Sequence, residues 1–379
     1  MNPKNKLKEK LGKKLSEKFK VGILGATGMV GQRLILLLQD HPWFTVTALA
    51  ASDRSSGKTY EEAVLDRWTQ QTLVPKEFAK QKVFSIEKDM QSIAEKVDLV
   101  FCAIDAEKNF IQKLEESYAS LGVPVISNNS AHRWTNDVPM ITPEINSEHL
   151  EMIKTQKKNR DFTTGFIVVK PNCSLQSFVP LLYAWKSFLP EKVIVSTYQA
   201  ISGAGKTFET WPEMKDNIIP YIGGEEEKSE KEPAKIFAEI KKDKLILSKI
   251  PKISASCIRV PVSDGHMATI NIKFGKKVTK EELVKALKNF KNPLDKLNLP
   301  SAPKPFITYF EEDDRPQTGL DRDLHNGMGI SAGRIREDSI LGWKCVALSH
   351  NTIRGAAGGS ILTAELLVKK GYIKSRKNK

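Results

Sequence analysis

A short apolar run followed at once by three spaced glycines constrains the start of this 379-residue chain more than any other feature. The run is Lys20-Val-Gly-Ile-Leu24, and the glycines stand in Gly25-Ala-Thr-Gly28-Met-Val-Gly31. Apolar residues at 34–38 continue the pattern, so the segment predicts a strand, a tight turn and a helix. Glycine permits such a turn and lets backbone N–H groups approach a pyrophosphate at the helix N-terminus. We therefore expect a dinucleotide site, and the alternative is a tight turn that binds nothing.

Strand and helix patterns alternate through the first half of the chain. Short β-branched runs at 44–51, 97–103 and 123–127 predict strands, and 108–121 predicts a helix. Such alternation is typical of a parallel sheet with right-handed crossovers. The fold class is therefore α/β, with a Rossmann-type parallel-sheet domain over residues 20–170.

The pattern changes after residue 170. A buried helix is predicted at 175–188, longer strands at 193–198, 254–260 and 268–274, and a surface helix at 280–290. Residues 225–232 are rich in Glu and Lys and predict a loop or lid, and 356–369 predicts a helix started by a glycine-rich turn. We expect an α+β domain with a mixed sheet over 171–349, and expect 350–373 to return to the first domain.

The basic charge lies at the two ends. The formal net charge is +14, of which residues 1–20 and 369–379 carry +6 each, so only +2 remains between them. We expect a solvated basic extension at 1–19, with a weak amphipathic helix at 5–19 as the alternative, and a basic tail at 374–379. Aromatic residues do not interleave with these charges, so no nucleic-acid partner is expected. No run of about 18 apolar residues and no secretory signal occur, so we expect no membrane partner and a cytoplasmic location.

One of the four cysteines stands in an unusual setting. No C-x-x-C pair or Cys/His cluster occurs, so neither disulfides nor a metal site are expected. Cys102, Cys257 and Cys345 fit buried apolar thiols. Cys173 instead lies between Asn172 and Ser174, where an extended segment gives way to a helix. The helix dipole would lower the pKa of this thiol, and Asn172 is placed to donate to an oxyanion, so Cys173 is the candidate nucleophile.

The segment Ser52-Asp-Arg-Ser-Ser-Gly-Lys58 ends the second predicted strand and should select the nicotinamide cofactor. An acidic residue there binds the ribose 2′-OH of NAD, whereas NADP needs cations and hydroxyls for its 2′-phosphate. The donors outnumber the single acid at 53, so NADP is predicted, and dual specificity stays open. The predicted donors are Ser52, Arg54, Ser55 and Lys58.

The segment Arg259-Val-Pro-Val-Ser-Asp-Gly-His266 supplies two further candidates. Arginine suits bidentate capture of a carboxylate, and histidine suits proton transfer near neutral pH. The alternative is that both are ordinary surface residues near a turn.

Six motifs in this order resemble the aspartate-β-semialdehyde dehydrogenases, in the branch common in archaea and fungi. They are the glycine turn, Pro-Asn-Cys-Ser at 171–174, Ser-Thr-Tyr-Gln-Ala-Ile-Ser-Gly-Ala-Gly at 196–205, Gly-Gly-Glu-Glu-Glu-Lys at 223–228, Arg259 with His266, and Ser-His-Asn-Thr-Ile-Arg-Gly-Ala-Ala-Gly at 349–358. The likeness runs from about residue 20 to 373.

The resemblance implies roles for individual residues. Cys173 would be the acyl-accepting nucleophile, His266 the general acid/base, and Gln199 would orient the substrate. Arg259 would bind the α-carboxylate, with one of the glutamates at 225–227, most simply Glu225, receiving the amino group or bracing Arg259. Lys228 and Arg133 would hold phosphate. Cofactor contacts are expected from Gly25, Thr27, Gly28, Met29 and Val30, and from Ser202, Gly203 and Asn351, with the glycines at 355 and 358.

The implied reaction is the NADPH-dependent reduction of L-aspartyl 4-phosphate to L-aspartate 4-semialdehyde, which serves lysine, threonine and methionine biosynthesis. A homodimer or homotetramer assembled through the second domain's sheet is also implied. One alternative is malonyl-CoA or malonate-semialdehyde reduction. Another is a non-catalytic relative that acts as a binding module, although every proposed catalytic position holds a competent residue type.

Overall fold

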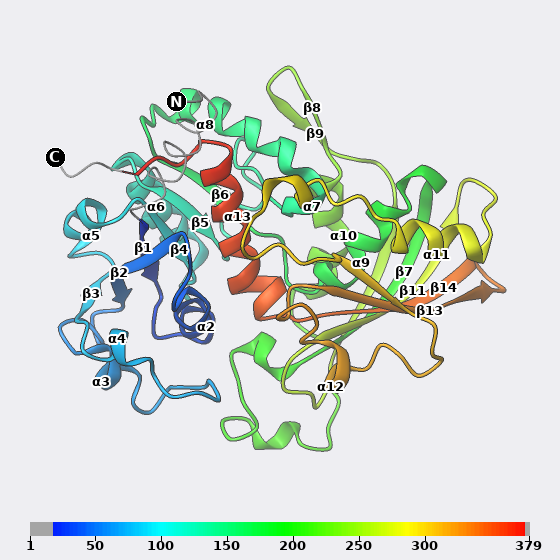
Figure 1. The fold of residues 1–379 in the computed structure, drawn as a ribbon, viewed down its shortest axis with the longest axis horizontal. Coiled ribbons are helices and arrows are strands. Elements are labelled where there is room, and N and C mark those ends of the chain that lie inside the picture. Colours follow the sequence, from blue (N-terminus) through cyan, green and yellow to red (C-terminus); the bar gives the residue numbers. More distant parts are fainter. Residues whose placement is uncertain (1–17, 376–379) are drawn as a thin grey trace, which may run out of the picture.

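The computed structural model describes residues 18–375, which form two sheets with a long C-terminal helix between them (Figure 1). The predicted basic extension, its alternative helix at 5–19 and the basic tail lie outside the described residues, apart from residues 18, 19, 374 and 375. No helix among the described residues is long and apolar enough to cross a membrane.

The first sheet has six parallel strands in the order β3-β2-β1-β4-β5-β6. Its strands are β1 Phe19–Leu24, β2 Phe44–Ala51, β3 Val83–Ser85, β4 Leu99–Cys102, β5 Pro124–Ser127 and β6 Phe166–Val169. β1 pairs with both β2 and β4, so the strand order reverses there. Ligands of such sheets bind at this reversal, beyond the carboxyl ends of the strands. The prediction of a Rossmann-type sheet is confirmed.

Four helices of this part of the chain contact the sheet, α2 Met29–Leu38, α5 Met90–Lys96, α6 Lys108–Ser120 and α8 Met152–Arg160. The short helices α3 Tyr60–Val64, α4 Lys76–Ala79 and α7 Pro143–Asn146 lie in the connections between its strands. The turn from β1 into α2 needs glycine for two physical reasons. Gly25 has φ +88°, which L side chains rarely adopt. A β-carbon at Gly31 would lie 2.2 Å from the carbonyl oxygen of Gly25.

The second sheet is mixed, as predicted, with the order β10-β7-β11-β14-β13-β12. Its strands are β7 Pro190–Gln199, β10 Lys252–Arg259, β11 His266–Phe274, β12 Ile307–Phe310, β13 Ile330–Asp338 and β14 Gly342–Ser349. β10 runs parallel to β7, whereas β11 runs antiparallel to both β7 and β14. The hairpin of β8 Glu239–Lys241 and β9 Lys244–Ile246 and the short helix α12 Thr318–Asp321 lie outside it.

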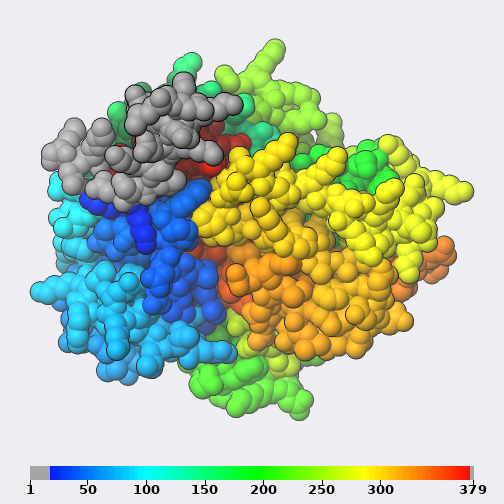
Figure 2. Space-filling view, viewed as in Figure 1, coloured from blue at the N-terminus to red at the C-terminus, as the bar shows by residue number. Residues whose placement is uncertain are grey.

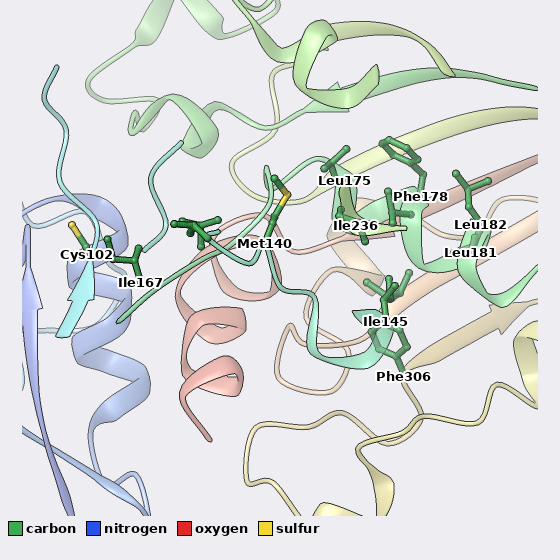
Figure 3. Close-up of a cluster of buried hydrophobic side chains, with 14 of the residues drawn as sticks. Cys102, Met140, Ile145, Ile167, Leu175, Phe178, Leu181, Leu182, Ile236 and Phe306 are labelled. Atoms are coloured by element: carbon green, nitrogen blue, oxygen red, sulfur yellow. The ribbon is translucent and has the colours of Figure 1, made fainter. Parts of the chain in front are cut away.

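Helices α9 Leu175–Ala184 and α11 Lys280–Lys288 pack on this sheet. The buried side chains of α9 form one continuous apolar cluster with residues from several elements (Figure 3). They are Leu175, Phe178, Leu181 and Leu182, joined by Ile145 of α7, by Ile236 and by Phe306. Because α9 starts two residues after Cys173, this packing also anchors the candidate nucleophile.

The loop predicted at 225–232 is wrong, because residues Glu225–Ile236 form helix α10. Gly224 in a left-handed conformation precedes the helix, and three glutamates occupy its first turn, where negative charge favours the helix dipole. The buried face carries Glu225, Ser229, Glu232 and Ile236. A polar buried face hides the helical periodicity of apolar residues, which explains the wrong prediction.

The C-terminal segment returns to the first sheet, as predicted. Its start differs from the glycine-rich turn that was expected, because a π-helical turn, Ile353–Ala357, leads directly into α13 Gly358–Lys369. Helix α13 contacts α2, β5 and α7. In the space-filling view, its red atoms show between the blue N-terminal part and the yellow and orange part (Figure 2).

A buried ion pair fastens this segment to the first half of the chain. The guanidinium of Arg354 donates to both carboxylate oxygens of Glu144, at 2.6 and 2.7 Å, and both side chains are fully buried. A third bond, from Nε of Arg354, reaches the side-chain oxygen of Gln176 on α9. The pair thereby joins α7, α9 and the π-helical turn.

Replacing Glu144 with Ala should leave the Arg354 charge buried without its counter-ion. We expect a loss of about 3–5 kcal/mol in the free energy of unfolding, measured by urea titration. The control is Lys80→Ala, which removes an exposed pair with Glu61 and should cost about 0–1 kcal/mol. A loss in Glu144→Ala no larger than in the control would contradict this account of the pair.

Candidate active site

Three predicted residues meet where strands of the second sheet end. The parallel register of β7 and β10 places Gln199 beside Arg259, and both end their strands. The antiparallel strand β11 begins at His266 next to β7. All three side chains are buried. The fold thus gathers residues that lie up to 67 positions apart at one edge of the sheet.

The peptide groups of Ala200 orient the histidine and the arginine together. Its N–H donates to Nδ1 of His266 at 3.1 Å, and its carbonyl accepts from Nη1 of Arg259 at 2.6 Å. Because Nδ1 accepts, the neutral imidazole carries its proton on Nε2. This Nε2 is buried and has no hydrogen-bond partner among the described residues. It is therefore available for proton exchange with a bound molecule.

A glycine-containing loop covers this pair. A β-carbon at Gly203 would lie 2.9 Å from Nη1 of Arg259 and 3.2 Å from Nε2 of His266, so a larger residue would crowd both groups. The neighbouring Ser202 accepts a bond from Nδ2 of Asn351 at 2.9 Å. The side-chain oxygen of Asn351 accepts from the N–H of Gly265 at 2.8 Å. The predicted group of Ser202, Gly203 and Asn351 is thus assembled from two distant segments.

Cys173 is the only one of the four cysteines that is not buried; all four are free thiols. Its neighbour Asn172 is held tightly on every side. The side-chain N–H groups of Asn172 donate to both oxygens of Glu225, at 2.9 and 3.0 Å, and its backbone N–H donates to Glu232 at 2.7 Å. Its side-chain oxygen accepts from the N–H of Ser174. In this arrangement, the amide of Asn172 has no donor left for an oxyanion.

The expected lowering of the thiol pKa is wrong for this structure. Burial, and next the negative charge of Glu225, raise the pKa of Cys173 to about 12. Arg133, Arg259 and Lys228 act in the opposite direction but do not compensate. The helix start is present as predicted, but desolvation of the thiolate outweighs it. The resting thiol is therefore protonated.

The glutamate that faces the nucleophile is Glu225. It is buried, and its Oε1 lies 2.8 Å from Nζ of Lys228. Burial opposes ionisation, but the charge and hydrogen bond of Lys228 leave the pKa of Glu225 below its usual value, so it is a carboxylate. Glu226 accepts from the backbone of Cys257, and Glu227 pairs with Lys231 at the surface. Arg259 bonds to Ala200 rather than to Glu225.

The guanidinium of Arg133 is engaged by the protein. It donates to the carbonyl of Lys170 and to Glu232, both at 2.9 Å, and to the carbonyl of Asn128 at 3.3 Å. Sequence reasoning missed Glu232 and Lys170. Glu232 lies seven residues after Glu225, which is two helical turns, so a helix prediction at 225–236 would have placed it on the same face.

The predicted dinucleotide residues lie in two groups at the edge of the first sheet. Gly25, Thr27, Gly28, Met29 and Val30 form the turn from β1 into α2, and no side chain caps the first N–H groups of this helix. Free N–H groups at a helix start suit a pyrophosphate. The second group follows β2, next to β1 in the sheet.

The residues after β2 favour binding of the 2′-phosphate of NADP over the free 2′-hydroxyl of NAD. Asp53 pairs with Lys88 at 2.8 Å and accepts from Ser85 at 2.7 Å, so its charge is neutralised within the protein. Ser52, Arg54 and Lys58 are exposed, whereas Ser55 is buried. Ser55 is bonded by Nη2 of Arg67 at 3.0 Å, and sequence reasoning missed this arginine.

A cleft of about 740 Å³ extends from the glycine turn to the loop over His266. Met29 of the glycine turn and Ser202 of the loop over His266 both line it. Arg33, one turn further along α2, also faces it, and Nε of Arg33 is buried without a partner among the described residues. The cleft has the size and polarity that a nucleotide needs.

Gly355 in the π-helical turn packs directly against the nucleophile. A β-carbon there would lie 2.7 Å from Cβ and 3.1 Å from Cα of Cys173. Gly355→Ala should displace Cys173 and lower aldehyde-dependent NADP reduction by about 10²-fold, the usual result of a shift near 1 Å. The control Gly319→Ala has open space around it and should keep full activity. Equal activities in the two variants would show that the close approach of Gly355 does not position Cys173.

The buried histidines should make stability fall in mild acid. Burial lowers the pKa of His266 to about 3 and that of His350 to about 4. The unfolded chain binds protons at these sites below about pH 6.5, whereas the folded chain does not. The contribution of the two neutral histidines to the free energy of unfolding is therefore complete above pH 6.5 and is lost as the pH falls towards 4. Urea titrations between pH 6.5 and 5 should show a slope that His266→Asn reduces by up to about 1.4 kcal/mol per pH unit. An unchanged slope would mean that His266 titrates normally.

Comparison with known proteins agrees with this geometry. Family models described as semialdehyde dehydrogenase, NAD binding domain, and semialdehyde dehydrogenase, dimerisation domain, match residues 20–153 and 179–354. An aspartate-semialdehyde dehydrogenase of Archaeoglobus fulgidus is 44% identical over 94% of this chain and its own full length, and that of Saccharomyces cerevisiae is 42% identical over 96% of this chain and its full length. A crystal structure of the Candida albicans enzyme with NADP covers 94% of this chain and all of that one, with a TM-score of 0.84 at 38% identity. The chain therefore belongs to the aspartate-semialdehyde dehydrogenase family.

Proposed function

We infer that this protein is an NADP-dependent aspartate-semialdehyde dehydrogenase. In the biosynthetic direction it converts L-aspartyl 4-phosphate to L-aspartate 4-semialdehyde and releases phosphate. The observation that carries this function is the grouping of one accessible cysteine with a histidine and an arginine: Arg259 acts electrostatically on both Cys173 and His266.

The reaction proceeds through a thioester on Cys173. The sulfur attacks the acyl carbon of the substrate, the bond from that carbon to the phosphate oxygen breaks, and phosphate leaves. NADPH, when bound, supplies the hydride that reduces the acyl group. The free Nε2–H of His266 is suited to donating a proton to the substrate oxygen and to taking it back when the adduct collapses, while the proton of the thiol leaves with the phosphate. Collapse of the resulting adduct releases the aldehyde and returns the sulfur.

The remaining side chains bind the two ends of the substrate. Arg259 binds the α-carboxylate, and Glu225 receives the α-amino group, which suits a buried carboxylate. Gln199, whose amide donates only to Thr197 in this structure, orients the acyl group. Lys228 binds the leaving phosphate, and Arg133 joins it by exchanging one of its present partners for a phosphate oxygen. Asn172 fixes the position of Cys173 through its bonds to Glu225.

The cofactor fits the edge of the first sheet. The glycine turn and the start of α2 would hold the pyrophosphate, while Ser52, Arg54 and Lys58 would hold the 2′-phosphate of NADP. Asp53 does not oppose that phosphate, because Lys88 neutralises it. Asn351, Ser202 and Gly203 would bind the nicotinamide end. The Candida albicans relative was crystallised with NADP, which supports this cofactor.

Malonyl-CoA or malonate-semialdehyde reduction is not favoured. The relatives reported above are all aspartate-semialdehyde dehydrogenases. Malonate semialdehyde also lacks the amino group that would bind to Glu225. With this substrate, the buried carboxylate of Glu225 would have no cationic group of the substrate to bind. Phosphate-dependent NADP reduction with aspartate semialdehyde, run beside malonyl-CoA-dependent NADPH oxidation, distinguishes the two reactions.

A dimer through the second sheet is the assembly that we propose. The family model for residues 179–354 is described as a dimerisation domain. Helices α9 and α11 pack on the sheet, and Ile194 in its strand β7 remains 48% exposed. Pairing of two such sheets would bury this residue, and two dimers can associate further into a tetramer. We also propose that the domains divide at residue 170, and that the protein acts in the cytoplasm, where its four free thiols stay reduced.

Cys173→Ala should abolish turnover and leave NADP binding intact, because the thiol is needed for the thioester, whereas the groups predicted to hold the pyrophosphate and the 2′-phosphate lie at the edge of the first sheet. NADPH absorbance measures the first property and quenching of protein fluorescence by NADP the second. Cys345→Ala, at a buried thiol in β14, is the matched control and should stay active. Even a few per cent of residual activity in Cys173→Ala would overturn the assignment of the nucleophile.

A further inference from the structure

Lys170 is a buried lysine whose amino group has no role in the site described above. It follows β6, is 1% exposed, and its Nζ has no hydrogen-bond partner among the described residues. Another buried lysine, Lys235, shows the ordinary arrangement, since its Nζ donates to the carbonyls of Arg133 and Thr135 at 2.6 and 2.9 Å. Burying an amino group without partners costs free energy, so this position calls for an explanation beyond packing.

Lys170 and Cys173 both pack against one face of the C-terminal segment. A β-carbon at Gly359 would lie 2.3 Å from Nζ of Lys170, and one at Gly355 would lie 2.7 Å from Cβ of Cys173. Residues four apart on a helix are neighbours on its surface, about 5–6 Å from each other. The amino group of Lys170 and the side chain of Cys173 therefore pack one helical turn apart against the same surface.

Among the charged groups that affect the pKa of Lys170, the two arginines are paired with carboxylates, whereas Lys170 itself is not. After burial, its pKa responds to Arg354, Glu144, Arg133 and Cys173, in that order. Arg354 is paired with Glu144 and Arg133 is paired with Glu232. Both arginines thus have a carboxylate of their own, and Cys173 is the remaining group in this set that can become an anion.

We propose that Lys170 is a positioning residue for the nucleophile, and that its ammonium form stabilises the thiolate of Cys173. When the S–H bond breaks, the proton leaves for water, and the negative sulfur lies about one helical turn from a positive charge. No other reactant is required. The proposal rests on the proposed function only in taking Cys173 as the nucleophile.

This role explains how a desolvated thiol can still react. Glu225 opposes the thiolate, and the cations with the largest effect on Cys173 are Arg133, Arg259 and Lys228, whereas the coupling of Lys170 to Cys173 is seen in the pKa of the lysine. Arg133 and Lys228 are paired with carboxylates in the substrate-free protein. Burial lowers the pKa of Lys170 to about 7 although Cys173 acts to raise it, so the lysine carries its proton below about pH 7. The two groups stabilise each other's charged forms.

The test is the pH profile of Cys173 alkylation in Lys170→Met, which keeps the length of the side chain and removes the charge. The full chain reacts with iodoacetamide between pH 6 and 10 without substrate or cofactor, and peptide mass spectrometry quantifies labelling at Cys173. We expect alkylation at neutral pH to slow on the order of tenfold, and the whole profile of rate against pH to move to higher pH. Lys235→Met removes a buried lysine whose own pKa responds to Asp137 and Glu232 and not to Cys173, and it should leave the profile in place.

An unchanged profile of rate against pH in a Lys170→Met variant with native circular dichroism would overturn the proposal. If that variant does not fold, Lys170→Ala replaces it, and added propylamine should restore the alkylation rate by occupying the vacated space. Absence of restoration would also overturn the proposal. Because this assay uses neither substrate nor cofactor, it can fail while the proposed reaction stands. An active Cys173→Ala variant would refute the reaction without affecting the alkylation profile.

Discussion

The carboxylate of Glu232 connects three segments on which the site depends. One oxygen accepts from the guanidinium of Arg133, and the other accepts from the backbone N–H of Asn172, next to the nucleophile. The side chain is 1% exposed, so water cannot replace either partner. Losing one partner would leave a buried charge unpaired, which is costly. This interaction requires α10 to be a helix, because Glu225 two turns earlier holds the other end of Asn172.

The C-terminal segment forms the opposite wall of the site. Within five residues it binds the loop over His266 through Asn351, pairs with Glu144 through Arg354, and places Gly355 against Cys173. The two sheets are therefore not independent, because one short segment contacts the dinucleotide side, the nucleophile and the acid/base at once. Small residues are needed where this segment approaches the nucleophile.

Burial explains the protonation states of the substrate-free site. Desolvation raises the pKa of Cys173 and lowers that of His266, so both groups are neutral near pH 7. Glu225 remains ionised because Lys228 lies against it. In the proposed function, a bound substrate brings an amino group to Glu225 and anionic groups to Arg259 and Lys228, and these groups would change the charges that act on the thiol.

Much of the fold could be predicted from local patterns, whereas the contacts of the site could not. The glycine turn and the alternating strands predict the first sheet, because backbone sterics and periodicity act over a few residues. The loop predicted at 225–232 failed because the buried face of α10 is polar, and its partners lie about 100 residues earlier. Arg133 was expected to be free for phosphate, since no local pattern shows its bond to Glu232.

The sequence by itself determined the glycine turn, the parallel sheet, and the residue types able to perform thioester chemistry at Cys173, His266 and Arg259. Only the tertiary structure decided that Asn172 donates to Glu225, that Arg133 is paired and that the resting thiol is protonated. The physical reason is that hydrogen-bond partners and desolvation depend on which distant residues surround a group. Residue type sets what a side chain can do, and its burial and neighbours set the charge it carries.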